Sequence, residues 1–238
     1  MFRKTVAKHI EKSSLEFQHR GHDVKRIETF SDAVFAFAVT LLIVSLEVPK
    51  NFEELAIGMQ GFFAFGICFT LLMLIWYEQN IFFRRYNLND PLTITLNCML
   101  IFLVLFYVYP LKFLFTFLFN QKINGNLNSF KITGGQSQDL MIIYAAGYVA
   151  IYLIFFLMYL HALRKKMQLQ LTWIEEFETR TRMFASLVLI LIGVVSILLS
   201  IILPVSQIYL AGLTYVLIGP SLTMFYFFRA RNRKASQR

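Results

Sequence analysis

The chain has 238 residues, of which 57% are hydrophobic and 16% aromatic, and only 16% are charged, against roughly 25% in soluble domains. This composition, with a mean hydropathy of +0.59, excludes a soluble globular domain. The net charge of +9 does not indicate a nucleic-acid partner, because the basic residues flank apolar runs, where they meet anionic lipid headgroups.

Apolar runs long enough for a bilayer core of about 30 Å recur along the chain and predict an all-α membrane protein with six transmembrane helices. The runs do not alternate with period two, which argues against a membrane β-barrel. We expect the spans at about residues 27–48, 57–78, 92–118, 140–163, 183–203 and 206–228. Pro49 and Pro204 should end the first and fifth spans, whereas Pro110 should bend the third or end its lipid-exposed part, and Gly219-Pro220 should kink the sixth.

The connections between the spans differ in composition. Asp90-Pro91 is a good start for the third span, since proline suits the first helical position. Residues 120–138 are rich in Asn, Ser and Gly and predict a flexible loop outside the membrane. Residues 164–182 are charged and should continue helices beyond the membrane, with the acidic trio Glu175, Glu176 and Glu178 on a solvated helix face.

The basic residues predict the orientation of the chain. If the amino terminus is inside, 19 of the 23 Lys and Arg residues fall on inner segments, a clear positive-inside bias that places both termini in the cytoplasm. We therefore divide the chain into a basic amphipathic cytoplasmic segment at 1–26, a six-helix transmembrane domain at 27–228 and a basic cytoplasmic tail at 229–238.

The first span carries an ionisable residue, Asp32, which costs roughly 2.5–3.5 kcal/mol inside a membrane and therefore suggests a functional or architectural role. At about 3.6 residues per turn the helix has two faces. One stripe holds Phe30, Ala33, Phe37, Thr40, Leu41, Val44 and Val48, and the roughly opposite side holds Ser31, Asp32, Phe35, Val39, Leu42 and Leu46. The acidic side should meet helices of the same subunit, where Trp76 and Asn97 are candidate partners.

Arg26, followed by Phe30, Ser31 and Asp32 at the opening of the first membrane helix, resembles the signature of the transmembrane protein 175 family, the potassium channels that lack the usual carbonyl filter. Thr40-Leu41-Leu42 and Leu46-Glu47-Val48-Pro49 also look like the family, and Trp76 and Leu96-Asn97 match the family pattern more weakly. Six spans without an internal repeat resemble the bacterial members. The resemblance implies four copies around a central axis, in a bacterial plasma membrane, with the first helix of each copy lining a pore.

In that family, bulky apolar side chains of the first helix form the constriction, and the matching positions here are Phe37, Leu41 and Val44, with Thr40 as the nearby hydroxyl. Position 37 departs from the family pattern, which has Ile or Leu there, so either Phe37 or Leu41 could form the tightest ring. The resemblance also implies that Arg26, Phe30, Ser31 and Asp32 hold the first helix in place, the polar members through a hydrogen-bonded cluster, without touching the ion. It implies no cofactor, and no metal beyond permeating potassium.

Two other classes of protein remain open. A secondary transporter or proton-coupled carrier is the main alternative, although no inverted repeat is visible and Asp32 is the only acid expected to be buried, since Glu47 and Glu78 sit at span ends. A membrane-embedded enzyme would need a completed site. His19 and His22, with Glu16 one turn earlier, could share a helix face, but no recognised metal motif is completed. We therefore do not expect an enzyme.

Overall fold

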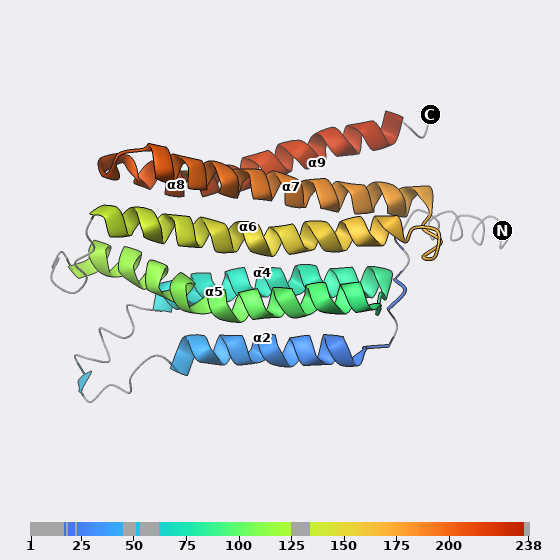
Figure 1. Cartoon of the computed structure of the whole chain (residues 1–238), viewed down its shortest axis with the longest axis horizontal. Coiled ribbons are helices and arrows are strands. Elements are labelled where there is room, and N and C mark those ends of the chain that lie inside the picture. The colour runs from blue at the N-terminus through green and yellow to red at the C-terminus, as the bar shows by residue number, and fades with distance from the viewer. Residues whose placement is uncertain are drawn as a thin grey trace, which may run out of the picture.

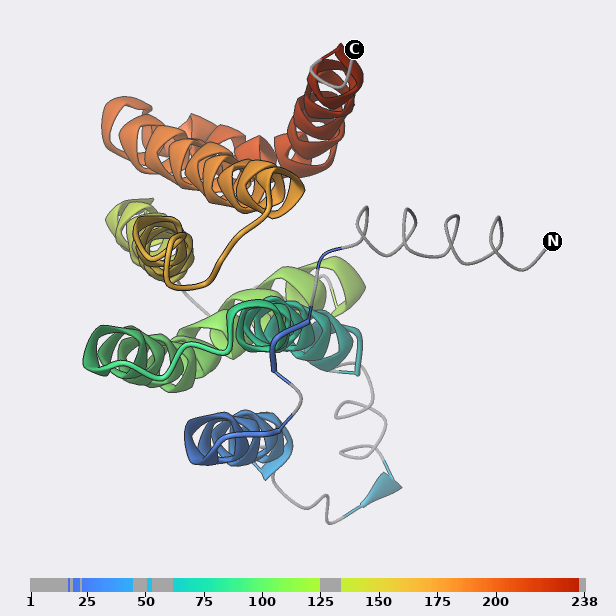
Figure 2. The ribbon, with the colours of Figure 1, turned by 90° about the vertical axis from the view of Figure 1, so that its right-hand side faces the viewer.

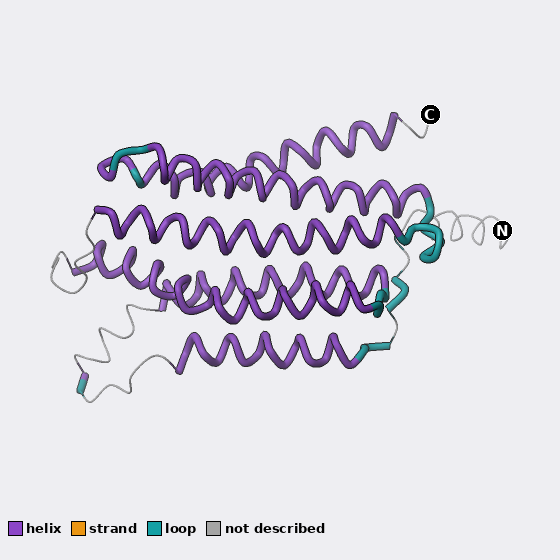
Figure 3. The backbone as a smooth tube through the Cα atoms, viewed as in Figure 1, coloured by secondary structure: helices purple, strands orange, loops and turns teal. Residues whose placement is uncertain are grey.

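The computed structural model describes residues 17, 19–21, 23–44, 51–52, 62–124 and 134–235, and Figure 1 shows their helices running along a common direction. The long helices are α2 (Arg26–Val44), α4 (Phe62–Tyr86), α5 (Pro91–Asn124), α6 (Gly134–Arg164), α7 (Trp173–Ile202) and α9 (Ile218–Ala235). Figure 3 shows only helices and loops in the described part of the chain, and five of its segments are long and apolar enough to cross a membrane. The predicted all-α membrane class is therefore confirmed.

The helices are stacked in the order of the sequence. Helix α2 lies at one edge of the bundle, α4 and α5 come next, α6 and α7 follow, and the last helical segments cover the opposite edge (Figure 1). Viewed from the end, α9 leans away from α7 (Figure 2). Residues 19–21, which precede α2, and the end of α9 lie at the same end of the bundle as the two turns that join α4 to α5 and α6 to α7.

Local sequence signals set the helix ends at these two turns. Helix α4 stops where Asn87 adopts a positive φ of 50°, a conformation that Asn tolerates better than most residues. Pro91 then opens α5, and the side chain of Asp90 accepts a hydrogen bond from Thr93 Oγ1 at 2.8 Å. At the start of α7, Thr172 and Glu175 form a capping box in which each side chain bonds the backbone of the other.

Aromatic side chains fill the interior where α4 and α6 meet. Phe82, Phe83, Tyr86, Phe155 and Tyr159 are each at most 2% exposed. Their rings meet mostly edge-on, as in the pair of Phe82 and Tyr159 with centroids 5.5 Å apart, an arrangement that adds about 0.5–1.5 kcal/mol to the burial of each pair. The interior of the described bundle is thus packed with protein.

Helices α6 and α7 approach closely at a glycine. A methyl group built on Gly193 of α7 would lie 2.5 Å from Cγ2 of Val149 and 2.9 Å from Cδ1 of Tyr148. Both contacts are closer than side chains tolerate, so the spacing of the two helices depends on this position. Small residues serve this purpose in membrane bundles, where close backbone approach replaces the hydrophobic drive for association.

Two sequence expectations about helix ends are corrected by the structure. The polar loop expected at 120–138 is shorter, because α5 continues to Asn124 and α6 begins at Gly134, while residues 125–133 lie outside the described part. Helix α4 likewise runs to Tyr86, eight residues beyond the predicted end at 78. A helix satisfies its own backbone bonds and can continue into water, so the change of composition marked the membrane boundary and not the helix end.

The sixth span differs from the continuous helix expected at 206–228. It consists of a 3-10 turn at Val205–Gln207, the short helix α8 (Tyr209–Leu213), a second 3-10 turn at Thr214–Leu217 and then α9. The break comes a few residues before the predicted kink at Gly219-Pro220. Pro220 has no N–H to donate to the carbonyl of Val216, four residues earlier, and this missing bond favours the 3-10 turn at that point.

Candidate functional site

Helix α2 has two faces with different surroundings in the protomer. Ser31, Phe35, Ala38 and Leu42 point into the bundle and are at most 1% exposed. On the other face Phe30 is 56%, Phe37 57% and Leu41 40% exposed, and Ala33 and Thr40 are exposed with them. We call the set Phe30, Ala33, Phe37, Thr40 and Leu41 the open stripe of α2. The side chain of Val44, at the last residue of the helix, lies outside the described part.

A buried chain of polar side chains holds the inner face of α2 against α4 and α5. The Ser31 hydroxyl donates to the carbonyl of Ile27 at 2.8 Å and accepts from Nδ2 of Asn97, also at 2.8 Å. Asn97 Oδ1 in turn accepts from Nε2 of Gln79 on α4. All three side chains are at most 2% exposed. Because each bond has a fixed geometry, this Ser31–Asn97–Gln79 network fixes both the rotation and the height of α2.

Asp32 lies beside this network and is held separately. The indole Nε1 of Trp76 on α4 donates to Asp32 Oδ1 at 2.7 Å, a charge-assisted bond of normal length. Of the two candidate partners named from the sequence, Trp76 therefore bonds Asp32, whereas Asn97 bonds Ser31 instead. In the isolated protomer Asp32 is nevertheless exposed, so part of its carboxylate surface faces away from the bundle.

Arg26 does not join Ser31 or Asp32 within the protomer. Its side chain is exposed and makes no hydrogen bond or ion pair with the residues that the structure describes. It borders a broad groove of about 630 Å³ between the start of α2 and α5, together with Phe30 and Ile94. Within the protomer, Ser31 and Asp32 thus bond different partners, and the single cluster of Arg26, Ser31 and Asp32 implied by the family resemblance stays a prediction.

Short bonds tie the segment just before α2 to both turns at the same end of the bundle. The Gly21 amide donates to the carbonyl of Arg84 at 3.0 Å, and Lys25 Nζ donates to the carbonyl of Asn87 at 2.6 Å. Arg20 reaches further and pairs with Glu175 through two bonds of 2.9 and 2.8 Å. The entry to α2 is therefore attached to α4 and α7.

The position of Glu175 corrects a sequence expectation. We expected it on a solvated helix face, but its side chain is completely buried and forms an ion pair with Arg20. Gln79 was also missed as a site residue. The available signal was its position one helical turn after Trp76, since positions three apart share a face of a helix.

No group of three or more His, Cys, Asp or Glu side chains that could hold a metal ion occurs among the described residues. Glu16 and His22, two members of the histidine grouping considered from the sequence, lie outside the described residues. His161 of α6 contacts the turn between α4 and α5, where its Nε2 is 2.8 Å from Oδ2 of Asp90, and Lys165 Nζ is 3.2 Å from Oδ1.

The chain is similar to several known proteins. The family described as "Endosomal/lysosomal potassium channel TMEM175" matches residues 26–108, which include α2, α4 and the part of α5 that carries Asn97. A potassium channel from Marivirga tractuosa is 39% identical over 221 residues, covering 88% of this chain and 89% of the relative. A potassium channel from Chamaesiphon minutus is 26% identical over 145 residues, covering 58% of this chain and 64% of the relative.

Two solved structures resemble the whole bundle. The crystal structure of the potassium channel MtTMEM175, a T38A variant in complex with a nanobody–MBP fusion protein, matches with a TM-score of 0.82 and 38% identity over 91% of this chain and 97% of that chain. A TMEM175 homologue from Chamaesiphon minutus matches with a TM-score of 0.54 at 23% identity, which is a likeness of fold. From the identity and coverage of the Marivirga relative, the chain is a multi-pass membrane protein that belongs to the TMEM175 family.

Proposed function

We propose that this protein is a potassium-permeable channel of the bacterial plasma membrane in which four copies gather around an axis and the α2 helix of each lines the ion path. The open stripe of α2 is the observation that carries the proposal. Apart from Thr40 it is apolar, it lies at the edge of the bundle, and its side chains are exposed in the described protomer. The relatives named as potassium channels support the same function.

The packing of the protomer supports a path between copies. The interior of the described bundle is filled by buried rings and aliphatic side chains, and Phe35 on the inner face of α2 is itself 1% exposed. A hydrated ion needs a continuous water-filled route, and close-packed interiors have few voids larger than one water molecule. Several copies that bring their α2 helices together would supply the route that one copy lacks.

The inner network supports a fixed direction for the open stripe. Ser31 is tied to α5 and α4 through Asn97 and Gln79, and Asp32 is tied to α4 through Trp76. These bonds lie on the side of α2 away from Phe37 and Leu41. They would hold the helix so that the same residues face the axis in every copy. In this proposal Ser31 and Asp32 position the helix and do not bind the ion.

The chemistry of the stripe points to a hydrophobic constriction. Rings of Phe37 and Leu41 would exclude water when the path is narrow and admit hydrated ions when it widens. The Thr40 hydroxyl already donates to the carbonyl of Phe37 at 2.7 Å, which leaves its oxygen able to accept but commits its proton. Potassium gives up hydration water more easily than sodium, so we expect a modest preference for potassium, without a ring of carbonyls to replace the hydration shell.

Electrical recording of the purified protein in a planar bilayer tests the function. Under opposing potassium and sodium gradients, a potassium-permeable channel gives a current that the gradients alone drive, with a reversal potential shifted toward that of potassium. A secondary transporter would instead need a coupled ion. The absence of any current carried by potassium alone would contradict the proposal.

Replacement of Leu41 by Asn tests the constriction. A polar ring holds water where an apolar ring excludes it, so Leu41→Asn should raise the resting current several-fold. Leu191→Asn is the matched control, because Leu191 is also an exposed leucine, 55% against 40%, and lies on α7, away from α2. An equal effect of both substitutions, or none from Leu41→Asn, would place the constriction elsewhere.

A further inference from the structure

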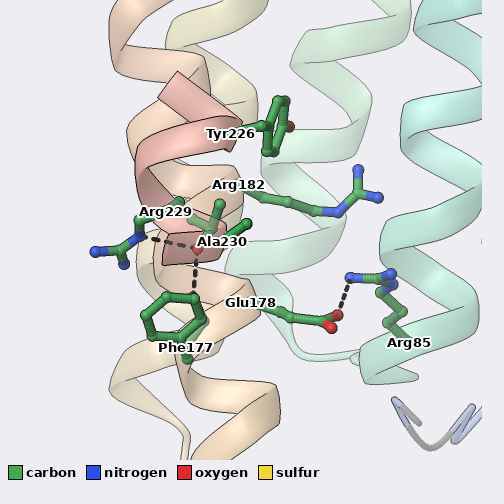
Figure 4. Close-up of a pocket in the computed structure, with 8 residues that line it drawn as sticks. Arg85, Phe177, Glu178, Arg182, Tyr226, Arg229 and Ala230 are labelled. Carbon is green, nitrogen blue, oxygen red and sulfur yellow. Dashed lines mark hydrogen bonds and ion pairs between the residues drawn. The ribbon is translucent and has the colours of Figure 1, made fainter. Parts of the chain in front are cut away.

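A cleft lies among α4, α6, α7 and α9, with no residue of α2 in its lining, and its two ends differ in character. The end near the helix termini, which we call the polar mouth, has a volume of about 320 Å³ and is lined by Arg85, Arg182, Arg229 and a single acidic residue, Glu178 (Figure 4). The other end, the apolar cleft, has a volume of about 270 Å³. The two parts share Arg182 and Tyr226, so they adjoin along α7 and α9.

The apolar cleft has the lining of a site for a hydrocarbon chain. Leu74 from α4, Leu189 from α7, and Ile218 and Leu222 from α9 line it, together with Glu78 and Arg182, which bond each other. Figure 2 shows α9 leaning away from α7 on the side where this cleft lies. Apolar side chains that face a gap inside a membrane are solvated by lipid chains, because no water is available there.

Arg85 gives the polar mouth unused hydrogen-bond donors. Its Nε and Nη1 atoms are buried and find no hydrogen-bond partner in the described part of the chain. The nearest carboxylate oxygen, Oε2 of Glu178, is 3.4 Å from Nη1, which is an ion pair and not a normal hydrogen bond. The guanidinium is also held 4.4 Å from the ring centre of Phe17. Buried donors without partners are rare, because each costs about 1–3 kcal/mol, and so they call for a partner.

The other two arginines are already fixed in place. Nη1 of Arg182 bonds both carboxylate oxygens of Glu78 at 2.9 Å, and the Tyr159 hydroxyl donates to the same carboxylate. Arg182 therefore reaches from α7 toward α4, as Figure 4 shows, with its charge held beside the mouth. Arg229 bonds Thr181 Oγ1 at 3.0 Å and lies over the ring of Phe177. These bonds hold two of the three arginines, and three arginines against one acidic residue make the lining of the mouth mainly positive.

We infer that this cleft binds an anionic phospholipid, with the phosphate at Arg85 and Arg182 in the polar mouth and an acyl chain in the apolar cleft. Guanidinium groups match phosphate geometry through paired N–H donors, and basic pockets between membrane helices are suited to acidic headgroups. The position of Arg85, one residue before the end of α4, puts the mouth at headgroup depth while the cleft extends toward the membrane interior. This inference concerns α4, α7 and α9 and does not depend on the ion path proposed for α2.

Native mass spectrometry of the purified full-length protein in detergent provides the test. Phosphatidylglycerol should bind with a stoichiometry of one per protomer and raise the melting temperature, whereas phosphatidylcholine should do neither at the same concentration. Glycerol phosphate separates the two sources of the phosphate. If it binds as tightly as the lipid, the site takes a soluble anion, and the lipid proposal is overturned.

Substitutions at the mouth separate a specific site from general attraction. Arg85→Gln should weaken phosphatidylglycerol binding about tenfold, the loss expected for one charge-assisted bond, and Arg85→Lys should restore part of it. Arg84→Gln is the matched control, because this exposed neighbour does not line the mouth. Equal losses from Arg84→Gln and Arg85→Gln would show non-specific charge attraction and overturn the proposal.

Two further variants distinguish lipid binding by Arg85 from a purely structural role of this residue. Glu178→Gln removes the negative charge nearest to Arg85, so lipid binding should become tighter. If Arg85 only stabilised the fold through Glu178, this variant would weaken binding as Arg85→Gln does, and the proposal would fail. Leu222→Trp fills the apolar cleft without changing any charge and should weaken binding of the lipid but not that of glycerol phosphate. Unchanged lipid binding in this variant would exclude the apolar cleft as the chain site.

Discussion

The Ser31–Asn97–Gln79 network gives the sharpest test of how α2 is held. Asn97→Leu keeps a side chain of similar size but removes both of its hydrogen bonds. Ser31 keeps its bond to the carbonyl of Ile27, whereas the Gln79 amide, 2% exposed, loses its acceptor in a dry interior. The lost bond costs about 1 kcal/mol, and a buried donor left without an acceptor costs about 1–3 kcal/mol. The substitution should therefore destabilise the protein by about 2–4 kcal/mol.

A double-mutant cycle makes this prediction refutable. Gln79→Leu combined with Asn97→Leu removes both polar groups together, so the double variant should cost at least about 0.5 kcal/mol less than the sum of the two single variants. Thermal melting of the purified protein in detergent measures the stability, and about 2–4 kcal/mol corresponds to roughly 5–15 °C for a chain of this size. Thr95→Ala on the exposed side of α5 is the control and should change little. Strictly additive costs for the pair would show that the two amides do not act as a network.

The other predictions concern helix spacing and pH. Gly193→Ala should destabilise the protein by about 1–3 kcal/mol, because the added methyl group overlaps Val149 and Tyr148, whereas Gly66→Ala, which meets nothing within 4 Å, should leave stability unchanged or slightly higher in the same melting assay. Equal effects at both positions would refute the close contact. Burial alone would raise the pKa of Asp90, but hydrogen bonds from Thr93, Lys165 and His161 outweigh it and lower the pKa to about 2. Stability from Asp90 should therefore be full above pH 4 and fall between about pH 4 and pH 2, and Asp90→Asn should reduce that part of the pH dependence, measured as melting temperature against pH.

The sequence predicted six long helices, as many as the described part of the chain contains, and the two faces of α2. Long apolar runs leave few alternatives in a membrane, since a chain there must satisfy its own backbone bonds. The spacing of Phe30, Phe37 and Leu41 along one stripe corresponds to the exposed face of α2, and Ser31 and Leu42 lie on the buried one. Asp32 is the exception, because its carboxylate is exposed in the protomer although it lies on the inner side.

The sequence did not predict which side chains pair in the folded protein, because these pairs join residues far apart in the chain. Glu175 looked like one member of a solvated acidic run, yet its partner Arg20 lies 155 positions away and buries it. The same holds for Asn97, whose assignment to Ser31 and not to Asp32 depends on the rotation of α5 against α2. Helix ends were missed for a different reason: polar residues such as those before Asn124 can extend a helix into water, so polarity alone does not mark its last turn.

The placement of α9 at the edge opposite α2 has a practical consequence for labelling. In an assembly with α2 at its centre, the α9 helix of each copy would lie at the outer rim (Figure 1). A fluorophore attached after α9 would therefore report on neighbouring molecules and on the surrounding bilayer while leaving conduction undisturbed. A probe placed before Arg20 would instead pull on the bonds that join the entry of α2 to Glu175 and Arg84.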